Sequence, residues 1–112
     1  MSEHRAHPRY EVAVRGEVEH QGDTLAAETQ NLSTGGVALA LRRTIPDGAV
    51  VSLQLFLTQD GFEDPDEAPL STKAAVRWSK AEGTRHVVGL QFAALDDKQK
   101  ALLERFLAAS AQ

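Results

Sequence analysis

Short runs in which every second residue is apolar recur along most of this chain, and they limit its possible folds more than any other feature. In each run, one set of alternate side chains can pack on a core while the other set faces water, which is typical of half-buried β-strands. Turn-forming residues, glycine above all, separate the runs. They predict six strands, at about residues 10–20, 25–29, 37–41, 51–57, 74–78 and 88–92. Strands that follow one another closely are expected to pair antiparallel in sequence order.

The period of the apolar residues changes near the C-terminus. Leu102, Leu103, Phe106 and Leu107 form a stripe at helical spacing. Asp96 with Gln99 three residues later is a capping-box pattern, so a helix is predicted over about 96–109. Six short strands and one helix indicate an all-β fold with a C-terminal helix. A six-stranded antiparallel β-barrel fits best, because closure leaves no exposed strand edge, and the helix is expected to cap one opening or lie on a flank.

The length of 112 residues predicts one compact domain. We expect residues 1–9, which contain two arginines and two histidines, to be a flexible basic N-terminal arm, and residues 10–112 to form the barrel with its helix. The stretch 59–70 has two prolines, one glycine and five acidic residues, and it is interpreted as a solvated loop. No apolar run reaches the ~20 residues of a membrane span, and no export signal is visible, so a cytoplasmic location and no membrane partner are expected.

The composition argues against catalysis, a metal site and DNA binding. The chain has no cysteine, no Gly-x-Ser-x-Gly elbow, no His-Glu-x-x-His and no phosphate loop, which predicts that it is not an enzyme and has no cofactor. The histidines, at positions 4, 7, 20 and 86, are interpreted as exposed polar residues rather than metal ligands. A net charge of −4 and 5% aromatic residues do not supply the basic aromatic face that nucleic acids require, so no DNA partner is expected.

Two short motifs carry the remaining chemistry. The arm contains Arg5-x-x-x-Arg9, and the loop between the second and third predicted strands contains Asn31-x-Ser33-x-x-Gly36. Two guanidinium groups can bind a phosphate through paired hydrogen bonds and stack on a purine. An amide and a hydroxyl can pair with base edges, and glycine lets the backbone approach a ligand. An alternative for the loop is a turn in which these side chains bond their own backbone.

In these motifs the sequence resembles the PilZ domain family of bacterial receptors for cyclic di-GMP. The resemblance extends from Arg5 to about Ala108 and includes the stretches 46–50, 75–78 and 88–92. It implies a six-stranded barrel with a C-terminal helix and a stand-alone, non-catalytic receptor that signals to an unidentified protein partner. Arg5 and Arg9 would contact guanine faces and phosphates, Asn31 and Ser33 would bond a guanine edge, and Gly36, with Gly35 beside it, would permit the shape of the loop. The arm would then fold over the bound nucleotide.

Three questions stay open at the level of sequence. Many family members carry another arginine at the position of His4, and its absence favours one bound dinucleotide over a stacked pair without deciding between them. Trp78, in a strand expected near the third, can fill the core, cover the surface or stack on guanine. The alternative function is a PilZ-like interaction module for motility or pilus assembly that binds no nucleotide.

Overall fold

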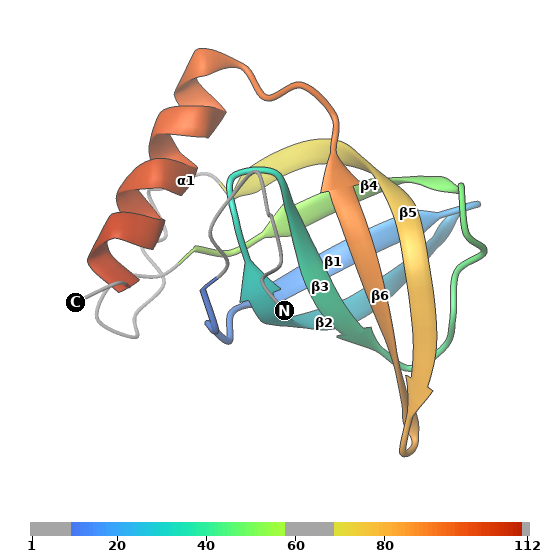
Figure 1. Cartoon of the computed structure of the whole chain (residues 1–112). Helices are drawn as coiled ribbons and strands as arrows, with labels where there is room; N and C mark the ends of the chain where they lie inside the picture. The colour runs from blue at the N-terminus through green and yellow to red at the C-terminus, as the bar shows by residue number, and fades with distance from the viewer. Residues whose placement is uncertain (1–9, 58–68, 111–112) are drawn as a thin grey trace, which may run out of the picture.

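A computed structural model describes residues 10–57 and 69–110, which form a closed antiparallel barrel with one helix (Figure 1). The predicted arm at 1–9 and most of the predicted acidic loop lie outside the described residues. The strands run in the spatial order β1-β2-β3-β6-β5-β4, and β4 pairs with β1 to close the barrel. This architecture confirms the predicted fold class. The elements are β1 (Arg15–His20), β2 (Asp23–Leu32), β3 (Gly36–Leu41), β4 (Val50–Leu55), β5 (Leu70–Glu82), β6 (Arg85–Phe92) and α1 (Asp97–Ser110).

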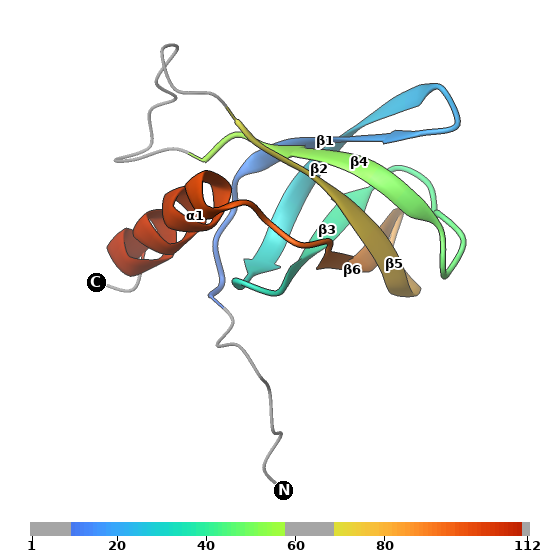
Figure 2. The ribbon, with the colours of Figure 1, turned by 90° about the horizontal axis from the view of Figure 1, so that it is seen from above.

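The pairing is not sequential throughout, so that part of the prediction was wrong. β3 pairs with β6, and β4 lies between β1 and β5. After β3 the chain crosses one end of the barrel, with Ile45 buried in the core, and β4 starts beside the other edge of β1 (Figure 2). Trp78 lies on β5, which β6 separates from β3.

A single core fills the barrel and continues into the helix. Alternate residues of the strands point inward, with fully buried leucines such as Leu39, Leu53 and Leu55 at the centre. From α1, Leu103, Phe106 and Leu107 belong to the same core, whereas Leu102 is half-buried. The helix lies across one end of the barrel, as its apolar stripe predicts (Figure 1).

Several predicted boundaries are corrected by the structure. β1 begins at Arg15 rather than at residue 10, and residues 10–14 precede it without being part of the strand, apart from an isolated bridge between Tyr10 and Leu32. β5 is much longer than predicted, and it begins at Leu70, which is buried in the core rather than part of a solvated loop. β6 likewise begins earlier, at Arg85.

The capping box at the start of α1 is only half formed. The Asp96 carboxylate accepts a hydrogen bond from the Gln99 backbone N–H at 2.7 Å, as an N-cap should. The Gln99 side chain instead accepts a hydrogen bond from the backbone N–H of Ser71 in β5 at 3.0 Å. Gln99 therefore ties the helix to the barrel, which removes it from the reciprocal bond that a capping box requires.

Candidate functional site

The loop between β2 and β3 is held by the hydroxyl of Ser33. This oxygen accepts hydrogen bonds from the backbone N–H groups of Gly35 and Gly36, each at 3.1 Å, and donates to the Gly36 carbonyl at 3.3 Å. The backbone N–H of Ser33 donates to the same carbonyl at 2.9 Å. Ser33 is only 7% exposed. The loop is thus a serine-centred turn that bonds its own backbone, one of the two arrangements that the sequence allows.

Two glycines of this loop are fixed by the neighbouring strand β6. The Gly35 carbonyl accepts a hydrogen bond from the Phe92 backbone N–H at 3.0 Å. A Cβ at Gly36 would overlap the carbonyl oxygen of Leu90. Gly36 does not adopt a positive φ, so close packing between β3 and β6, rather than an unusual backbone angle, requires glycine here.

A β-bulge turns Asn31 toward the outside of the barrel. Thr29 pairs with Leu39 and Asn31 pairs with Ala38, so Gln30 is an extra residue on β2. Strict alternation from Thr29, which is buried, would have placed Asn31 inside as well. With the bulge, Gln30 is exposed and Asn31 half-buried on the outer face. The amide therefore lies on a surface that a ligand can reach.

A second bulge, on β5, turns Trp78 outward in the same way. Val76 pairs with Leu90 and Trp78 pairs with Gly89, which leaves Arg77 as the extra residue. Trp78 is 36% exposed, and a Cβ at Gly89 would overlap its indole, so the ring lies against this glycine. Trp78 therefore covers the surface of the barrel and does not fill its core.

The register connects the two bulges across the outer face. Asn31 on β2 pairs with Ala38 on β3, which pairs with Gly89 on β6, which in turn pairs with Trp78 on β5. Paired residues in neighbouring strands point to the same face. The row therefore has an amide at one end and an indole at the other, with two small, buried residues between them, and the indole lies over Gly89.

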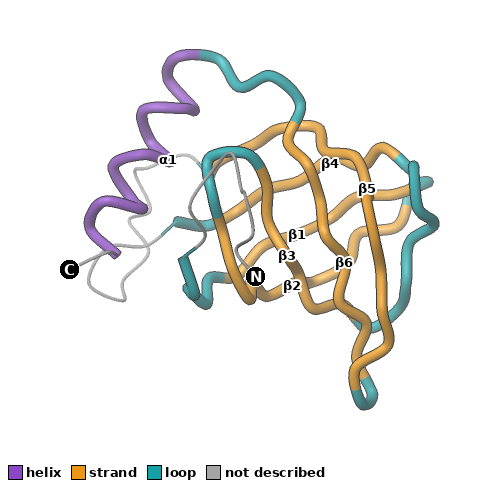
Figure 3. The backbone as a smooth tube through the Cα atoms, in the orientation of Figure 1, coloured by secondary structure: helices purple, strands orange, loops and turns teal. Residues whose placement is uncertain are grey.

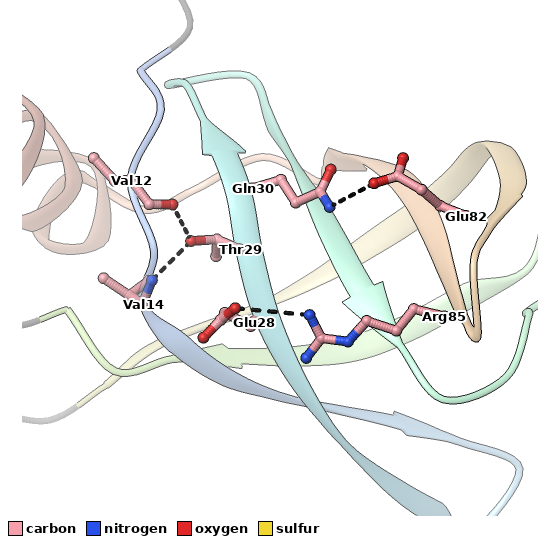
Figure 4. Close-up of polar contacts among 7 residues, drawn as sticks. All are labelled: Val12, Val14, Glu28, Thr29, Gln30, Glu82 and Arg85. Atoms are coloured by element: carbon pink, nitrogen blue, oxygen red, sulfur yellow. Dashed lines mark hydrogen bonds and ion pairs between the residues drawn. The ribbon is translucent and has the colours of Figure 1, made fainter.

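The N-terminal segment joins the barrel beside the loop. Tyr10 and Leu32 exchange two backbone hydrogen bonds of 2.9 Å. Thr29, which is 2% exposed, accepts a bond from the Val14 N–H at 2.9 Å and donates to the Val12 carbonyl at 2.6 Å (Figure 4). The Thr29 N–H also donates to the Val14 carbonyl at 2.9 Å, so the Thr29 side chain and a few backbone bonds together hold residues 10–14 against β2. Thr29 faces inward, and a polar residue at an inward position of a strand is the signal that could have revealed this role.

The site residues predicted from the sequence come together only in part. Asn31, Ser33, Gly35 and Gly36 share one short stretch, and Tyr10 follows Arg9 directly in the chain. The segment before β1 and the β2–β3 loop both lie at the end of the barrel where α1 sits (Figures 1 and 3). Trp78 lies at the far end of the row. Arg5 and Arg9 lie outside the described residues.

Polar side chains from β2 reach across the outer face toward β5 and β6, which the sequence did not indicate. The Gln30 side-chain amide donates to a Glu82 carboxylate oxygen at 3.5 Å, and Arg85 lies 3.9 Å from a Glu28 carboxylate oxygen (Figure 4). On the same part of the face, Val87 pairs with the exposed Lys80 yet is itself 1% exposed. These contacts lie beyond the row of Asn31 and Trp78.

Comparison with known proteins identifies the domain. The model of the PilZ domain family matches residues 3–109. The chain belongs to the PilZ family. PilZ domains are non-catalytic receptor domains for cyclic di-GMP (c-di-GMP). A search of curated proteins found no match for this PilZ chain.

Solved structures share the fold of this PilZ domain. The Bacillus subtilis inhibitor of motility MotI/DgrA superposes with a TM-score of 0.78 at 15% identity, over 96% of this chain and 50% of that chain, so the chain spans half the length of that protein. The PilZ domain of YcgR from Escherichia coli, solved with c-di-GMP, gives a TM-score of 0.74 at 13% identity over 97% and 92% of the two chains. A tetrameric PilZ protein from Xanthomonas campestris gives 0.57 at 28% identity, over 77% and 43%.

The described parts of the chain contain neither a candidate metal cluster nor a membrane-spanning helix. Within residues 10–57 and 69–110, no group of three or more histidine and acidic side chains could hold a metal ion. Over the same residues, no helix has the length and apolar character that crossing a membrane requires.

Proposed function

We propose that this PilZ domain binds cyclic di-GMP on the outer face of the barrel and orders its N-terminal arm over the nucleotide as a signal to a partner protein. The observation that carries the proposal is the pairing of Tyr10 with Leu32. It joins the segment that follows Arg5 and Arg9 to the strand end between Asn31 and Ser33. The residue that directly follows the arm motif and the residues of the loop motif thereby lie at one end of the barrel, as one ligand site requires.

Each residue has a distinct role in this proposal. Arg5 and Arg9 bind phosphates and stack on guanine, since a guanidinium can do both. Asn31, turned outward by its bulge, bonds a guanine edge with its amide. The main role of Ser33 is to hold the shape of the loop, together with Gly35 and Gly36. Its hydroxyl can also bond guanine if it gives up or shares its hydrogen bond to the Gly36 carbonyl. The YcgR PilZ domain, which shares the fold and was solved with c-di-GMP, supports this nucleotide as the ligand.

Calorimetric titration with cyclic di-GMP tests the proposal, with GMP and cyclic AMP as controls. We expect heat specific to cyclic di-GMP, and the stoichiometry separates one bound nucleotide from a stacked pair. Arg9→Ala should remove a charge-assisted contact of about 1.5 to 3 kcal/mol, which weakens binding roughly ten- to hundred-fold. Silence from folded protein that carries no co-purified nucleotide would refute the proposal and support the nucleotide-free interaction module instead.

Trp78 extends the proposed site as a surface on which a base can stack. Its indole lies against Gly89 in the row that begins at Asn31, with part of the ring exposed. Base stacking on an aromatic side chain is worth about 1 to 3 kcal/mol, so Trp78→Ala should weaken cyclic di-GMP binding by roughly tenfold. The same titration measures it. An unchanged dissociation constant in a folded variant would mean that Trp78 only covers the barrel surface and does not bind the ligand.

A further inference from the structure

The bulge on β5 presents an arginine next to the exposed tryptophan. Because Arg77 has no partner in the β5–β6 register, Arg77 and Trp78 are both exposed on the outside, whereas Val76 before them is buried. A regular strand would have sent one of two consecutive side chains into the core. The bulge therefore places a cation and an aromatic ring side by side on the outer face.

A neutral side chain holds this arginine in place. The Arg77 Nε donates a hydrogen bond to the Gln91 side-chain oxygen at 2.7 Å. Gln91 lies on β6 and pairs through the backbone with Gly36, the last residue of the loop motif. The bond thus links the guanidinium of β5 to β6, the strand that pairs with β3 and the loop residue Gly36. Neighbouring strands are about 4.8 Å apart, so β6 lies roughly two strand spacings, on the order of 10 Å, from the β2 strand that carries Asn31.

The partner of Arg77 leaves its charge intact. Two other exposed arginines, Arg43 and Arg85, form ion pairs with Asp23 and Glu28. Among the residues that the structure describes, no carboxylate forms an ion pair with Arg77. An amide oxygen fixes the direction of a guanidinium through Nε without neutralising it, and the Nη1 and Nη2 groups retain the geometry to donate to an anion.

We propose that Arg77 is a third binding arginine of the site, supplied by the barrel, and that it contacts a phosphate of the bound cyclic dinucleotide, with Gln91 as its positioning residue. The inference rests on the proposed function. It adds a binding cation on the barrel to Arg5 and Arg9, the two arginines of the arm that bind the ligand in the proposed function.

The test compares two arginines that carry the same charge on different parts of the barrel. Arg77→Gln and Arg43→Gln each remove one positive charge from an exposed side chain. β3 begins at Gly36, beside the loop, and Arg43 follows its other end. At about 3.3 Å per residue, Arg43 therefore lies on the order of 20 Å from the loop. Cyclic di-GMP is titrated into each variant, and circular dichroism and thermal unfolding verify the fold.

We expect Arg77→Gln to weaken binding roughly ten- to hundred-fold and Arg43→Gln to leave it unchanged. Arg77→Lys, which keeps the charge but loses the planar fork, should fall between wild type and Arg77→Gln. Gln91→Leu should weaken binding by a smaller factor than Arg77→Gln does. Gln91→Glu should weaken binding more than Gln91→Leu, because its carboxylate neutralises Arg77.

Three results would overturn the inference, and they are distinguishable from one another. If wild type binds cyclic di-GMP and Arg77→Gln binds equally well, Arg77 is not a binding residue while the receptor function stands. Equal weakening by Arg77→Gln and Arg43→Gln would also overturn it, because the effect would then be one of net charge. A wild-type protein that binds no cyclic di-GMP would refute the proposed function together with this assignment.

Discussion

Different kinds of interaction hold the two sides of the proposed site, the β2 side around the β2–β3 loop and the β5 side around Arg77 and Trp78. On the β2 side, the loop of Ser33 and Gly36 and the segment around Val14 are held mainly by backbone groups and by two buried hydroxyls. On the β5 side, Arg77 and Trp78 are held by side-chain contacts on the surface. Both sides contain a β-bulge, and each bulge turns outward a residue that alternation would have placed inside.

This difference implies different tolerance to change. Backbone and buried hydroxyls cannot move without leaving polar groups unpaired, and each such group costs about 1 to 3 kcal/mol. Exposed side chains can adopt another rotamer at little cost, since they lose contacts that water partly replaces. We therefore expect the β2 side to be the rigid half of the site and the β5 side to be the adaptable half.

The largest effect is expected at Thr29, the buried residue that attaches the N-terminal segment to β2. Thr29→Val keeps the shape of the side chain but leaves the Val14 N–H without its acceptor and the Val12 carbonyl without its donor. A buried donor and a part-buried acceptor left unpaired should together cost about 2 to 4 kcal/mol. Thermal unfolding should show a Tm lower by about 10 °C or more. Hydrogen exchange at the Tyr10 amide should also accelerate, because the segment is released.

Thr29→Ser is the matched control for this variant. It keeps the hydroxyl and loses only a methyl group, for which about 1 kcal/mol is expected. A loss of Tm as large as that of Thr29→Val would mean that the methyl group, not the pair of hydrogen bonds, stabilises the segment. That result would remove the argument that buried hydroxyls make the β2 side rigid.

Much of the fold could be predicted from the sequence because its signals are local. Alternation located all six strands, and the stripe of Leu103, Phe106 and Leu107 located the helix. The pairing order could not be predicted, since alternation identifies the inner face of a strand and not its neighbour. The start of β1 was misplaced because Thr29, distant in sequence, takes the hydrogen bonds that residues 12 and 14 would have given to a regular ladder.

The site residues also divide into those with a local sequence signal and those that depend on pairing between strands. The motif indicated Asn31, Ser33 and Gly36 because they lie within six residues of one another. The bond between Arg77 and Gln91 joins two strands and leaves no pattern at short range. The bulges have no signature of their own either, because an extra residue is defined only by the residues it fails to pair with on the next strand.

Replacing one glycine on each side by alanine compares the two sides directly. The expected losses of stability are smaller than for Thr29→Val. A Cβ at Gly36 would overlap a backbone oxygen, that of Leu90, whereas a Cβ at Gly89 would overlap the indole of Trp78. Gly36→Ala should therefore cost about 1 to 3 kcal/mol, the usual range for overpacking. In Gly89→Ala the indole can rotate outward, and alanine also lowers the entropy of the unfolded chain, so the net change should stay within about 1 kcal/mol.

Fluorescence distinguishes the two variants, because Trp78 is the chain's only tryptophan. Gly89→Ala should shift its emission to longer wavelength as the indole moves into water, while Gly36→Ala should leave the emission of the folded state unchanged and lower the Tm. If Gly89→Ala instead lowers the Tm as much as Gly36→Ala with no spectral shift, the indole cannot move. The β5 side would then be as rigid as the β2 side, and Arg77 and Trp78 would form a fixed surface to which the ligand must fit.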